Sequence, residues 1–251
     1  MLQFTKYFSG AALLLLACAP TYAVVIQSFD GGTIAPGSSS LTYAGNAGPS
    51  AGCAGNSALY GEGTYAVTTN ANSCHNFWSP TGPQSSPNFM AVNGSNLTTQ
   101  ANIYSQTVST GIVAGNGYNF SAWISGLYSA DAAILSLRVY DGVGTSGALL
   151  TTLSSFATNL AGGPLNQPAT TAAAWVQQSI AFKAISGTVT VQVFNMSTTN
   201  NGNDFGLDTL EVVQTSTAPS GPPNGGSATP EPASFLLAGS ALIGLALVRR
   251  K

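Results

Sequence analysis

Short segments rich in β-branched and aromatic residues alternate with Gly, Asn, Pro and Ser clusters along most of this chain. This pattern constrains the fold more than any other feature, because no segment between the two ends shows a sustained helical period. From Thr188 to Val193, valines alternate with Thr and Gln, so a strand there has one apolar and one polar face. Leu135 to Val139 repeats the alternation with Arg138 on the water side, and Tyr118 to Ile124 forms a third stripe. The sequence therefore predicts an all-β fold of two packed antiparallel sheets.

Ten segments have the length and composition of strands. They are 24–29, 64–69, 89–92, 103–109, 118–124, 134–140, 149–153, 175–182, 188–194 and 205–213.

The N-terminal segment has the features of an export signal. Lys6 precedes an apolar stretch from Ala11 to Ala17, and Thr21-Tyr22-Ala23 supplies small residues for cleavage before Val24. We therefore predict a signal peptide over residues 1–23. An alternative is that Leu15-Leu16-Ala17-Cys18 is a lipobox and that Cys18 is lipidated after cleavage.

The chain contains three cysteines, and Cys18 would leave with the signal peptide. Cys53 and Cys74 then remain in an oxidising compartment, where we expect them to form a disulfide. Closing a loop of about 20 residues would stabilise the fold by about 3 kcal/mol. Two cysteines with one nearby histidine, His75, do not complete a zinc ligand set.

The charge balance excludes several classes of partner. The segment from Val24 to Thr229 holds seven acidic residues and two basic ones, Arg138 and Lys183, for a formal charge of about −5. Nucleic acid and anionic membrane surfaces are therefore poor candidates, because no basic footprint exists.

The C-terminal segment combines three elements in a fixed order: Pro230-Glu231-Pro232, an apolar run over 234–248, and Arg249-Arg250-Lys251. As a helix the run would span about 22 Å, which is short for a comfortable transmembrane span. The arrangement over 230–251 resembles the PEP-CTERM sorting signal of Gram-negative bacteria. The resemblance implies transient insertion in the inner membrane, processing by an exosortase, and delivery to the cell surface or an exopolysaccharide matrix. A plain C-terminal membrane anchor is the alternative.

A Pro/Gly/Ser/Thr linker over 215–229 separates this tail from a single predicted domain over 24–214. Within the domain, four motifs appear in order: Ser28-Phe29-Asp30-Gly31-Gly32, Glu62-Gly63-Thr64-Tyr65-Ala66-Val67, Asn88-Phe89-Met90-Ala91-Val92-Asn93-Gly94 and Gly202-Asn203-Asp204-Phe205-Gly206-Leu207-Asp208-Thr209-Leu210. Gly117-Tyr118-Asn119-Phe120-Ser121-Ala122-Trp123 lies between the third and the fourth. The ordered set resembles the galactose-binding-like jelly rolls found in carbohydrate-binding modules and bacterial surface proteins. The resemblance implies a two-sheet jelly-roll sandwich.

If the first and last strands pair, Asp30 and Asp208 approach each other, and carboxylates with nearby carbonyls suit Ca²⁺, which takes roughly six to eight oxygen ligands. The resemblance implies a structural calcium there, with Asn93 and Asp204 as weaker candidate ligands. Thr209 replaces the second of the paired aspartates typical of the pattern. The alternative is that Asp30 and Asp208 cap turns by accepting hydrogen bonds from local amides.

Sugar binding requires aromatic platforms together with planar polar side chains. Trp78 and Phe77 in the segment His75 to Pro80, and Tyr128 after the strand that ends at Ile124, are the candidates. Trp123 and Trp175 occur in strand contexts, and a core position is the favoured interpretation for Trp175.

Two functions follow from these features. The first is an exported, non-catalytic surface or matrix protein, with exopolysaccharide as a candidate ligand and Ca²⁺ as the candidate cofactor. The second is a secreted hydrolase acting on polysaccharide, which needs paired carboxylates in a cleft. A Ser-His-Asp site would require the sole histidine, His75, and no Gly-x-Ser-x-Gly motif is present.

Overall fold

The computed structural model describes residues 23–34, 37–45, 52–78, 82–84, 87–95, 101–128, 132–158, 175–199 and 203–215. The predicted signal peptide, linker and sorting tail, including the helix expected over 234–248, lie outside these residues apart from Ala23 and Thr215. Within the described ranges, no helix has the length and hydrophobicity needed to cross a bilayer.

The described residues form strands and one short 3₁₀ helix, η1. The elements are β1 (Ala23–Gln27), β2 (Thr42–Tyr43), β3 (Thr64–Thr68), η1 (Ala71–Ser73), β4 (Phe89–Asn93), β5 (Asn102–Val108), β6 (Gly117–Gly126), β7 (Ile134–Asp141), β8 (Leu149–Thr152), β9 (Phe156–Ala157), β10 (Val176–Lys183), β11 (Val189–Asn195) and β12 (Phe205–Gln214).

All ten predicted strands are present, and their ends differ from the predicted ends by at most two residues. The sequence pattern did not reveal β2 and β9. Each has only two residues, so neither is long enough to show an alternation.

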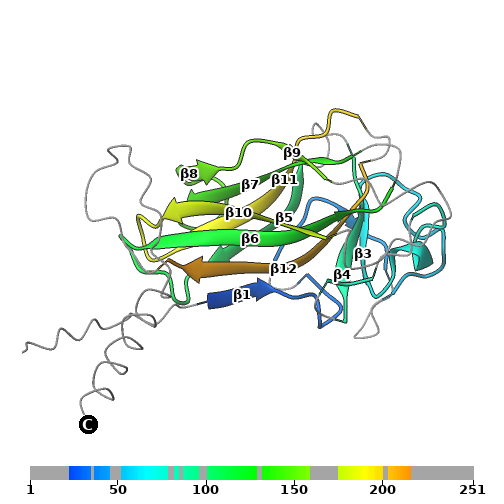
Figure 1. The fold of residues 1–251 in the computed structure, drawn as a ribbon, viewed down its shortest axis with the longest axis horizontal. Coiled ribbons are helices and arrows are strands. Elements are labelled where there is room, and N and C mark those ends of the chain that lie inside the picture. The colour runs from blue at the N-terminus through cyan, green and yellow to red at the C-terminus, as the bar shows by residue number, and fades with distance from the viewer. Residues whose placement is uncertain are drawn as a thin grey trace, which may run out of the picture. The chain divides into compact units, whose positions relative to one another are not determined.

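The strands form two sheets, here called sheet A and sheet B (Figure 1). Sheet A has the order β10-β6-β12-β4-β3-β2, with β1 also paired to β12, and sheet B has the order β5-β11-β7-β8, with β9 also paired to β7. Every pair is antiparallel except β2 with β3. From β4 to β12 the chain alternates between the sheets, apart from β7, β8 and β9, which share sheet B. This connectivity is a jelly roll, so the predicted two-sheet jelly-roll fold is confirmed.

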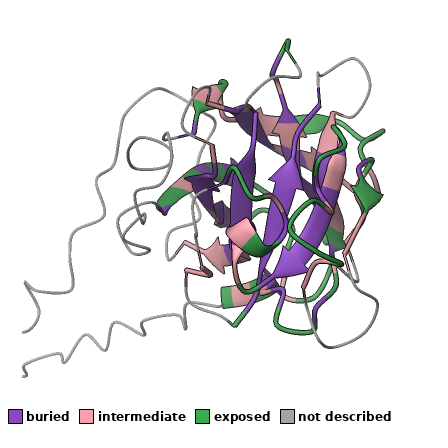
Figure 2. Cartoon of the chain, turned by 90° about the vertical axis from the view of Figure 1, so that its right-hand side faces the viewer, coloured by how far each residue is buried: buried purple, intermediate pink, exposed green. Residues whose placement is uncertain are grey.

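The main core lies between the two sheets and is built by the predicted alternation. Phe120 and Phe205 of sheet A and Leu137 and Val191 of sheet B are fully buried in one cluster. Figure 2 shows buried residues following the strands, with exposed residues concentrated in the connecting segments. Because both inner faces are apolar, packing of the two sheets fixes where the described strands begin and end.

The first and last strands pair as predicted, with Gln27 opposite Leu210. The pairing of β12 with β6 shifts register between Asp208 and Glu211, and Thr209 at this bulge has a positive φ of 35°. At this bulge the Asp208 carboxylate accepts hydrogen bonds from the backbone N–H groups of Thr209 and of Gln84.

The polar residues of β11 on the outer face of sheet B are buried. Thr190 and Gln192 alternate with the core valines, yet they are only 2% and 4% exposed. Thr190 Oγ1 donates to the carbonyl of Gly142, and Gln192 Nε2 donates to Asn102 Oδ1. Neighbouring polar groups therefore cover these two side chains, whereas Arg138 and Thr152 of the same sheet stay partly or fully exposed.

Candidate functional site

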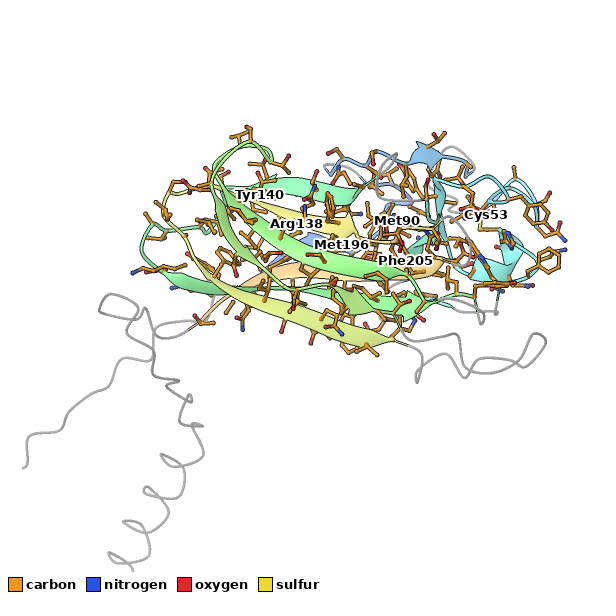
Figure 3. The ribbon with its side chains drawn as sticks, turned by 90° about the horizontal axis from the view of Figure 1, so that it is seen from above. Cys53, Met90, Arg138, Tyr140, Met196 and Phe205 are labelled. Atoms are coloured by element: carbon orange, nitrogen blue, oxygen red, sulfur yellow. A yellow bond between two sulfur atoms is a disulfide. The ribbon has the colours of Figure 1, made fainter. Side chains whose placement is uncertain are left out.

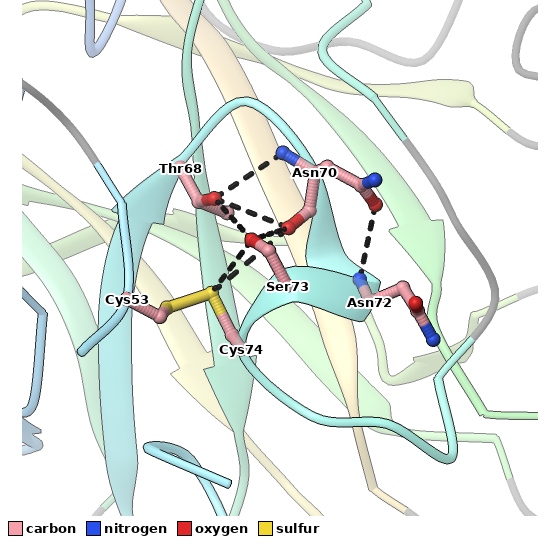
Figure 4. The surroundings of a disulfide bond; sticks show 6 residues. All are labelled: Cys53, Thr68, Asn70, Asn72, Ser73 and Cys74. Atoms are coloured by element: carbon pink, nitrogen blue, oxygen red, sulfur yellow. Dashed lines mark hydrogen bonds between the residues drawn. A yellow bond between two sulfur atoms is a disulfide. The ribbon is translucent and has the colours of Figure 1, made fainter. Parts of the chain in front are cut away.

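A disulfide joins Cys53 and Cys74, as predicted, with their Cα atoms 5.0 Å apart. Figure 4 shows the polar contacts around it. Asn70 caps η1, because its side-chain oxygen accepts a hydrogen bond from the backbone N–H of Asn72. Ser73 Oγ donates to the carbonyl of Asn70 and lies 3.8 Å from Cys74 Sγ. The bridge therefore ends on a short helix whose start is itself fixed by side-chain hydrogen bonds.

Further hydrogen bonds act within the second arm of this loop and between its two arms. Asn72 Nδ2 donates to the carbonyls of Asn76 and Trp78, at 3.3 and 3.0 Å. Across the loop, the N–H of Leu59 donates to the carbonyl of Cys74. Asn93 Nδ2 of β4 donates to the carbonyl of Leu59 at 2.7 Å, which attaches the loop to sheet A. Segments 53–60 and 70–78 thus form one rigid surface.

Four rings gather on this surface, and we call Tyr60, His75 and Phe77 the aromatic platform. Tyr60 and Phe77 are 45% and 56% exposed, with their centroids 6.1 Å apart and their planes 22° apart. His75 contacts both, at 4.5 Å from the Tyr60 ring and 5.7 Å from the Phe77 ring. Beneath them, Trp78 stacks on His75 at 4.8 Å with an interplanar angle of 14°. The platform therefore presents two nearly parallel rings to solvent on a buried aromatic base.

His75 is a neutral member of this stack. Burial lowers the pKa of its imidazole, which disfavours the charged form. Its Nδ1 atom is buried and has no hydrogen-bond partner among the described residues. A neutral imidazole is compatible with the close contacts that His75 makes with three other rings.

Trp78 was predicted to be a sugar platform, but the structure places it elsewhere. Its side chain is only 2% exposed, and its Nε1 donates a hydrogen bond to Asp204 Oδ2 at 2.9 Å. Asp204 immediately precedes β12, so this bond links the aromatic stack to the last strand of sheet A. Trp78 therefore supports the platform from below, whereas Phe77 lies on its surface.

In this region, the Asp204 carboxyl is the acid whose pKa is shifted most. Burial raises its pKa to about 7, a nearby Glu62 carboxylate adds to the rise, and the hydrogen bonds from Trp78 and Gly94 oppose it. Burial also raises the pKa of Glu62. The Asp204 carboxyl therefore titrates near neutral pH, next to the Trp78 ring at the base of the aromatic stack.

The other predicted aromatic residues lie around a second apolar cluster, which contains Leu59, Trp78 and Phe89. Tyr128 and Trp123 are partly buried against it. Trp175 is 6% exposed, packs edge-on against Phe89 and donates to the carbonyl of Gly82, so its favoured core position is confirmed. Tyr128 does not stack on the platform rings in the described contacts.

The candidate calcium ligands fall into two groups with different partners. Asp208 is fully buried, and its carboxylate accepts hydrogen bonds from the N–H groups of Gln84 and Thr209. The Asp30 carboxylate accepts one from Ser28 Oγ. Asn93 and Asp204 instead hold the base of the platform.

Across the described ranges, no three His, Cys, Asp or Glu side chains are grouped so that they could hold a metal ion. The contact of Asp208 with the N–H of Thr209 matches the alternative turn-capping interpretation, whereas the contact with Gln84 spans 124 residues of sequence. Calcium binding stays a prediction, which a calorimetric calcium titration would test.

Sequence reasoning missed Tyr60 and the role of His75 in the platform. Tyr60 is 15 residues from His75 in the chain, and no periodic pattern connects them. The usable signal was the predicted disulfide, since bridging Cys53 to Cys74 brings their flanking segments together. Sequence reasoning also missed the stacking of Arg138 on Phe194, because the two residues lie on different strands. The Arg138 Cζ atom is 3.4 Å from the centroid of the Phe194 ring.

Several solved structures are similar to the chain at low identity. The EclA C-terminal domain, described as a sugar-binding protein, is 23% identical with a TM-score of 0.32, over 45% of this chain and 66% of that one. The Clostridium thermocellum xylanase 10B CBM22-1–GH10 modules are 13% identical with a TM-score of 0.39, over 66% and 26%. The CBM22-1 xylan-binding domain of Paenibacillus barcinonensis Xyn10C is 11% identical with a TM-score of 0.41, over 78% and 97%.

The chain therefore spans about two thirds of the EclA domain and about a quarter of the Clostridium thermocellum protein. Because each TM-score is below 0.5, we draw no functional conclusion from these likenesses. No curated protein matches the chain.

The C-terminal segment matches a family described as the PEP-CTERM protein-sorting motif, over residues 228–251. The match includes Pro230-Glu231-Pro232, the apolar run and Arg249-Arg250-Lys251, which are the three elements singled out in the sequence. This chain thus joins a two-sheet jelly-roll sandwich to the PEP-CTERM sorting motif of exported proteins that are processed at the membrane.

Proposed function

We propose that this protein is an exported, non-catalytic component of the cell surface or exopolysaccharide matrix, and that its sandwich binds polysaccharide through the aromatic platform. The sorting motif over 228–251 supports export and processing by an exosortase after transient insertion in the inner membrane. The platform geometry is the single observation that carries the binding proposal.

The platform has the properties that stacking on a sugar ring requires. The apolar C–H face of a pyranose packs against flat aromatic surfaces, and Tyr60 and Phe77 present two such surfaces that are nearly parallel. The disulfide and the loop hydrogen bonds hold these rings in place before a ligand arrives, so little conformational entropy is lost on binding. Tyr60 Oη donates to Asn76 Oδ1. This contact places a phenol oxygen and a side-chain amide at the platform edge, where sugar hydroxyls can reach them.

The non-catalytic part of the proposal is supported by the distribution of carboxylates. The described part of the sandwich has three cavities of similar size. One of about 200 Å³ is lined by the segment from Val25 to Thr33. A second of about 230 Å³ lies around Ile124 and Thr158, and a third of about 240 Å³ around Ser105 and Thr190. In these three cavities, as far as the described residues show, Asp30 is the one carboxylate. Glycoside hydrolysis needs two facing carboxylates.

Truncating the platform should weaken polysaccharide binding without unfolding the protein. We expect Tyr60→Ala and Phe77→Ala each to lower affinity by about tenfold, because each removes an exposed stacking surface worth about 1.4 kcal/mol. The measurement is retention of the purified, exported protein on a panel of immobilised neutral and acidic polysaccharides. A parallel assay for new reducing ends on the same polysaccharides separates binding from hydrolysis.

Ile185→Ala is the matched control, because Ile185 is also an exposed apolar residue, 66% exposed between β10 and β11. It should leave retention unchanged. If no polysaccharide retains the wild-type protein, the binding proposal is wrong. Release of reducing ends would instead show that the protein is a hydrolase.

A further inference from the structure

Arg138 occupies a prepared position on the outer face of sheet B. Its guanidinium carbon lies 3.4 Å from the centroid of the Phe194 ring, and one of its nitrogens donates to Met196 Sδ at 3.3 Å. Figure 3 labels Tyr140, Arg138 and Met196 beside one another along this part of the sandwich. The stack and the sulfur contact hold the planar group in one orientation, so its remaining edge has a defined direction.

This guanidinium keeps unused hydrogen-bonding capacity. Arginine has five N–H donors, and a thioether sulfur is a weak acceptor. Among the described residues, the Arg138 guanidinium donates a hydrogen bond to Met196 and stacks on Phe194, and no carboxylate pairs with it. A partly buried, unpaired guanidinium in a protein with few charges is suited to binding an acidic group from outside.

The surroundings of Arg138 supply neutral polar groups. Strand register places Gln192 of β11 and Thr152 of β8 directly opposite Arg138, and Tyr140 lies two residues further along β7. Tyr140 Oη lies 3.4 Å from Gln192 Oε1, and Gln192 in turn donates to Asn102. Gln192 itself is only 4% exposed, so it orients Tyr140 and offers no contact surface of its own. We call Arg138, Tyr140 and Thr152, which are partly or fully exposed, the polar face. It combines one cation with two hydroxyl groups, which matches a ligand that carries one carboxylate among several hydroxyls.

A cavity lies beside the polar face. A cavity of about 240 Å³ is lined by Ser38, Ser105, Thr107 and Thr190, among others. Thr190 pairs with Tyr140 across β11 and β7, so this hydroxyl-lined cavity adjoins the polar face. A chain of linked sugars could therefore contact both regions.

The charge count selects the class of acidic ligand. The other described cation, Lys183, is on β10 in sheet A, so the polar face has a single positive side chain. Densely charged polyanions such as nucleic acids bind through many cations at once. A uronic acid carries one planar carboxylate per sugar ring, and a planar carboxylate matches the fork of one guanidinium in a bidentate hydrogen bond.

We propose that the polar face binds the uronic acid residues of an acidic polysaccharide, with Arg138 holding the carboxylate and its neutral neighbours contacting the hydroxyls. This inference rests on the proposed polysaccharide-binding function and adds a second contact surface with its own ligand class. The platform would stack on sugar rings regardless of charge, whereas the polar face would require a carboxylate.

The test compares two forms of one polymer, polygalacturonate and its highly methyl-esterified counterpart, in which the same backbone has lost its charge. Affinity is measured by calorimetry on the purified exported protein. We expect the wild-type protein to prefer polygalacturonate by at least about tenfold, since the bidentate charge-assisted bond is lost with the ester.

Three variants identify the group responsible. Arg138→Met keeps an apolar stem over Phe194 but removes the guanidinium, and it should abolish the preference. Arg138→Lys keeps the charge without the planar fork, and it should retain only a small part of it. Lys183→Gln removes the same net charge from sheet A and should leave the preference unchanged. Thermal denaturation of each variant verifies that the sandwich remains folded.

The outcomes separate this inference from the proposed function. Equal affinity for the acid and its ester, or an undiminished preference in Arg138→Met, overturns the inference. The platform proposal is judged separately, by whether the protein is retained on neutral polysaccharides. An equal loss in Lys183→Gln also overturns it, because the preference would then reflect net charge. Phe77→Ala should weaken binding to both polymers and preserve their ratio.

Discussion

Replacing Asp204 by Asn should remove most of the pH dependence of stability between about pH 4 and pH 7. The folded-state pKa of Asp204 is raised to about 7, against an ordinary value of 3.8. The native state therefore holds this proton more tightly than the unfolded chain does. Stability from this group is fully present below about pH 4 and is lost as the pH rises through 7. The wild-type protein should lose up to about 4 kcal/mol over this interval.

Urea denaturation of wild type and Asp204→Asn at closely spaced pH values measures this effect. Because an amide does not ionise, the free energy of unfolding of the variant should fall much less than that of the wild type, and the remaining fall reflects Glu62, whose pKa is also raised by burial. Glu62→Gln should reduce the wild-type slope, since the Glu62 carboxylate contributes to the raised pKa of Asp204. Asp30→Asn, which removes an exposed carboxylate beyond the end of β1, is the surface control and should reproduce the wild-type curve.

The same titration should be visible in tryptophan fluorescence. Trp78 Nε1 donates to Asp204 Oδ2, so ionisation of the carboxylate changes the environment of the indole. We expect a fluorescence transition near pH 7 in wild type that is absent in Asp204→Asn. A wild-type protein whose stability rises with pH across this interval would show that Asp204 is not protonated in the native state.

Removing the disulfide should cost about 3 kcal/mol of stability. Cys53 and Cys74 are 21 residues apart, and cross-linking them restricts the unfolded chain. The double variant Cys53→Ala/Cys74→Ala avoids placing a polar group at the fully buried position of Cys74. Its urea midpoint should fall accordingly, and wild type measured in a thiol reductant should match it.

The double variant should also bind polysaccharide more weakly at the platform, even under conditions where it remains fully folded. His75, Phe77 and Trp78 follow Cys74 directly, while Tyr60 lies on the other arm of the loop, so the bridge helps to hold the rings at their stacking distances. Affinity for a retained polysaccharide, measured under conditions where the variant remains folded, should drop by about tenfold. Reductant should have no additional effect on the variant. An unchanged midpoint and affinity in reduced wild type would show that the loop hydrogen bonds suffice.

Local patterns in the sequence carried much of the fold. Alternating valines in β11, and the similar stripes in β6 and β7, have the two-residue period of a β-strand. Cysteine bookkeeping was enough to predict the Cys53–Cys74 bridge, and the order of proline, apolar and basic elements was enough to predict the sorting motif. Each of these signals is contained within a short stretch of chain or a simple count.

The sites required information that no short stretch contains. Trp78 looked like a surface platform because its neighbours are polar and loop-like, but Asp204, 126 residues away, accepts its indole hydrogen bond and holds it inside. Arg138 was expected to face water, and its stack on Phe194 depends on the pairing of β7 with β11. Which side chains meet across strands is decided by register and sheet order.

The sequence by itself determined that this chain is an all-β protein with one disulfide and a C-terminal sorting motif, because periodicity, composition and motif order are local properties. Only the tertiary structure decided that Tyr60 joins Phe77 and His75, that Trp78 lies beneath them, and that a single arginine lies among neutral groups on sheet B. The physical reason is that burial, hydrogen bonding and ring stacking join residues from distant strands, and the free energies of these contacts depend on positions that packing of the two sheets sets.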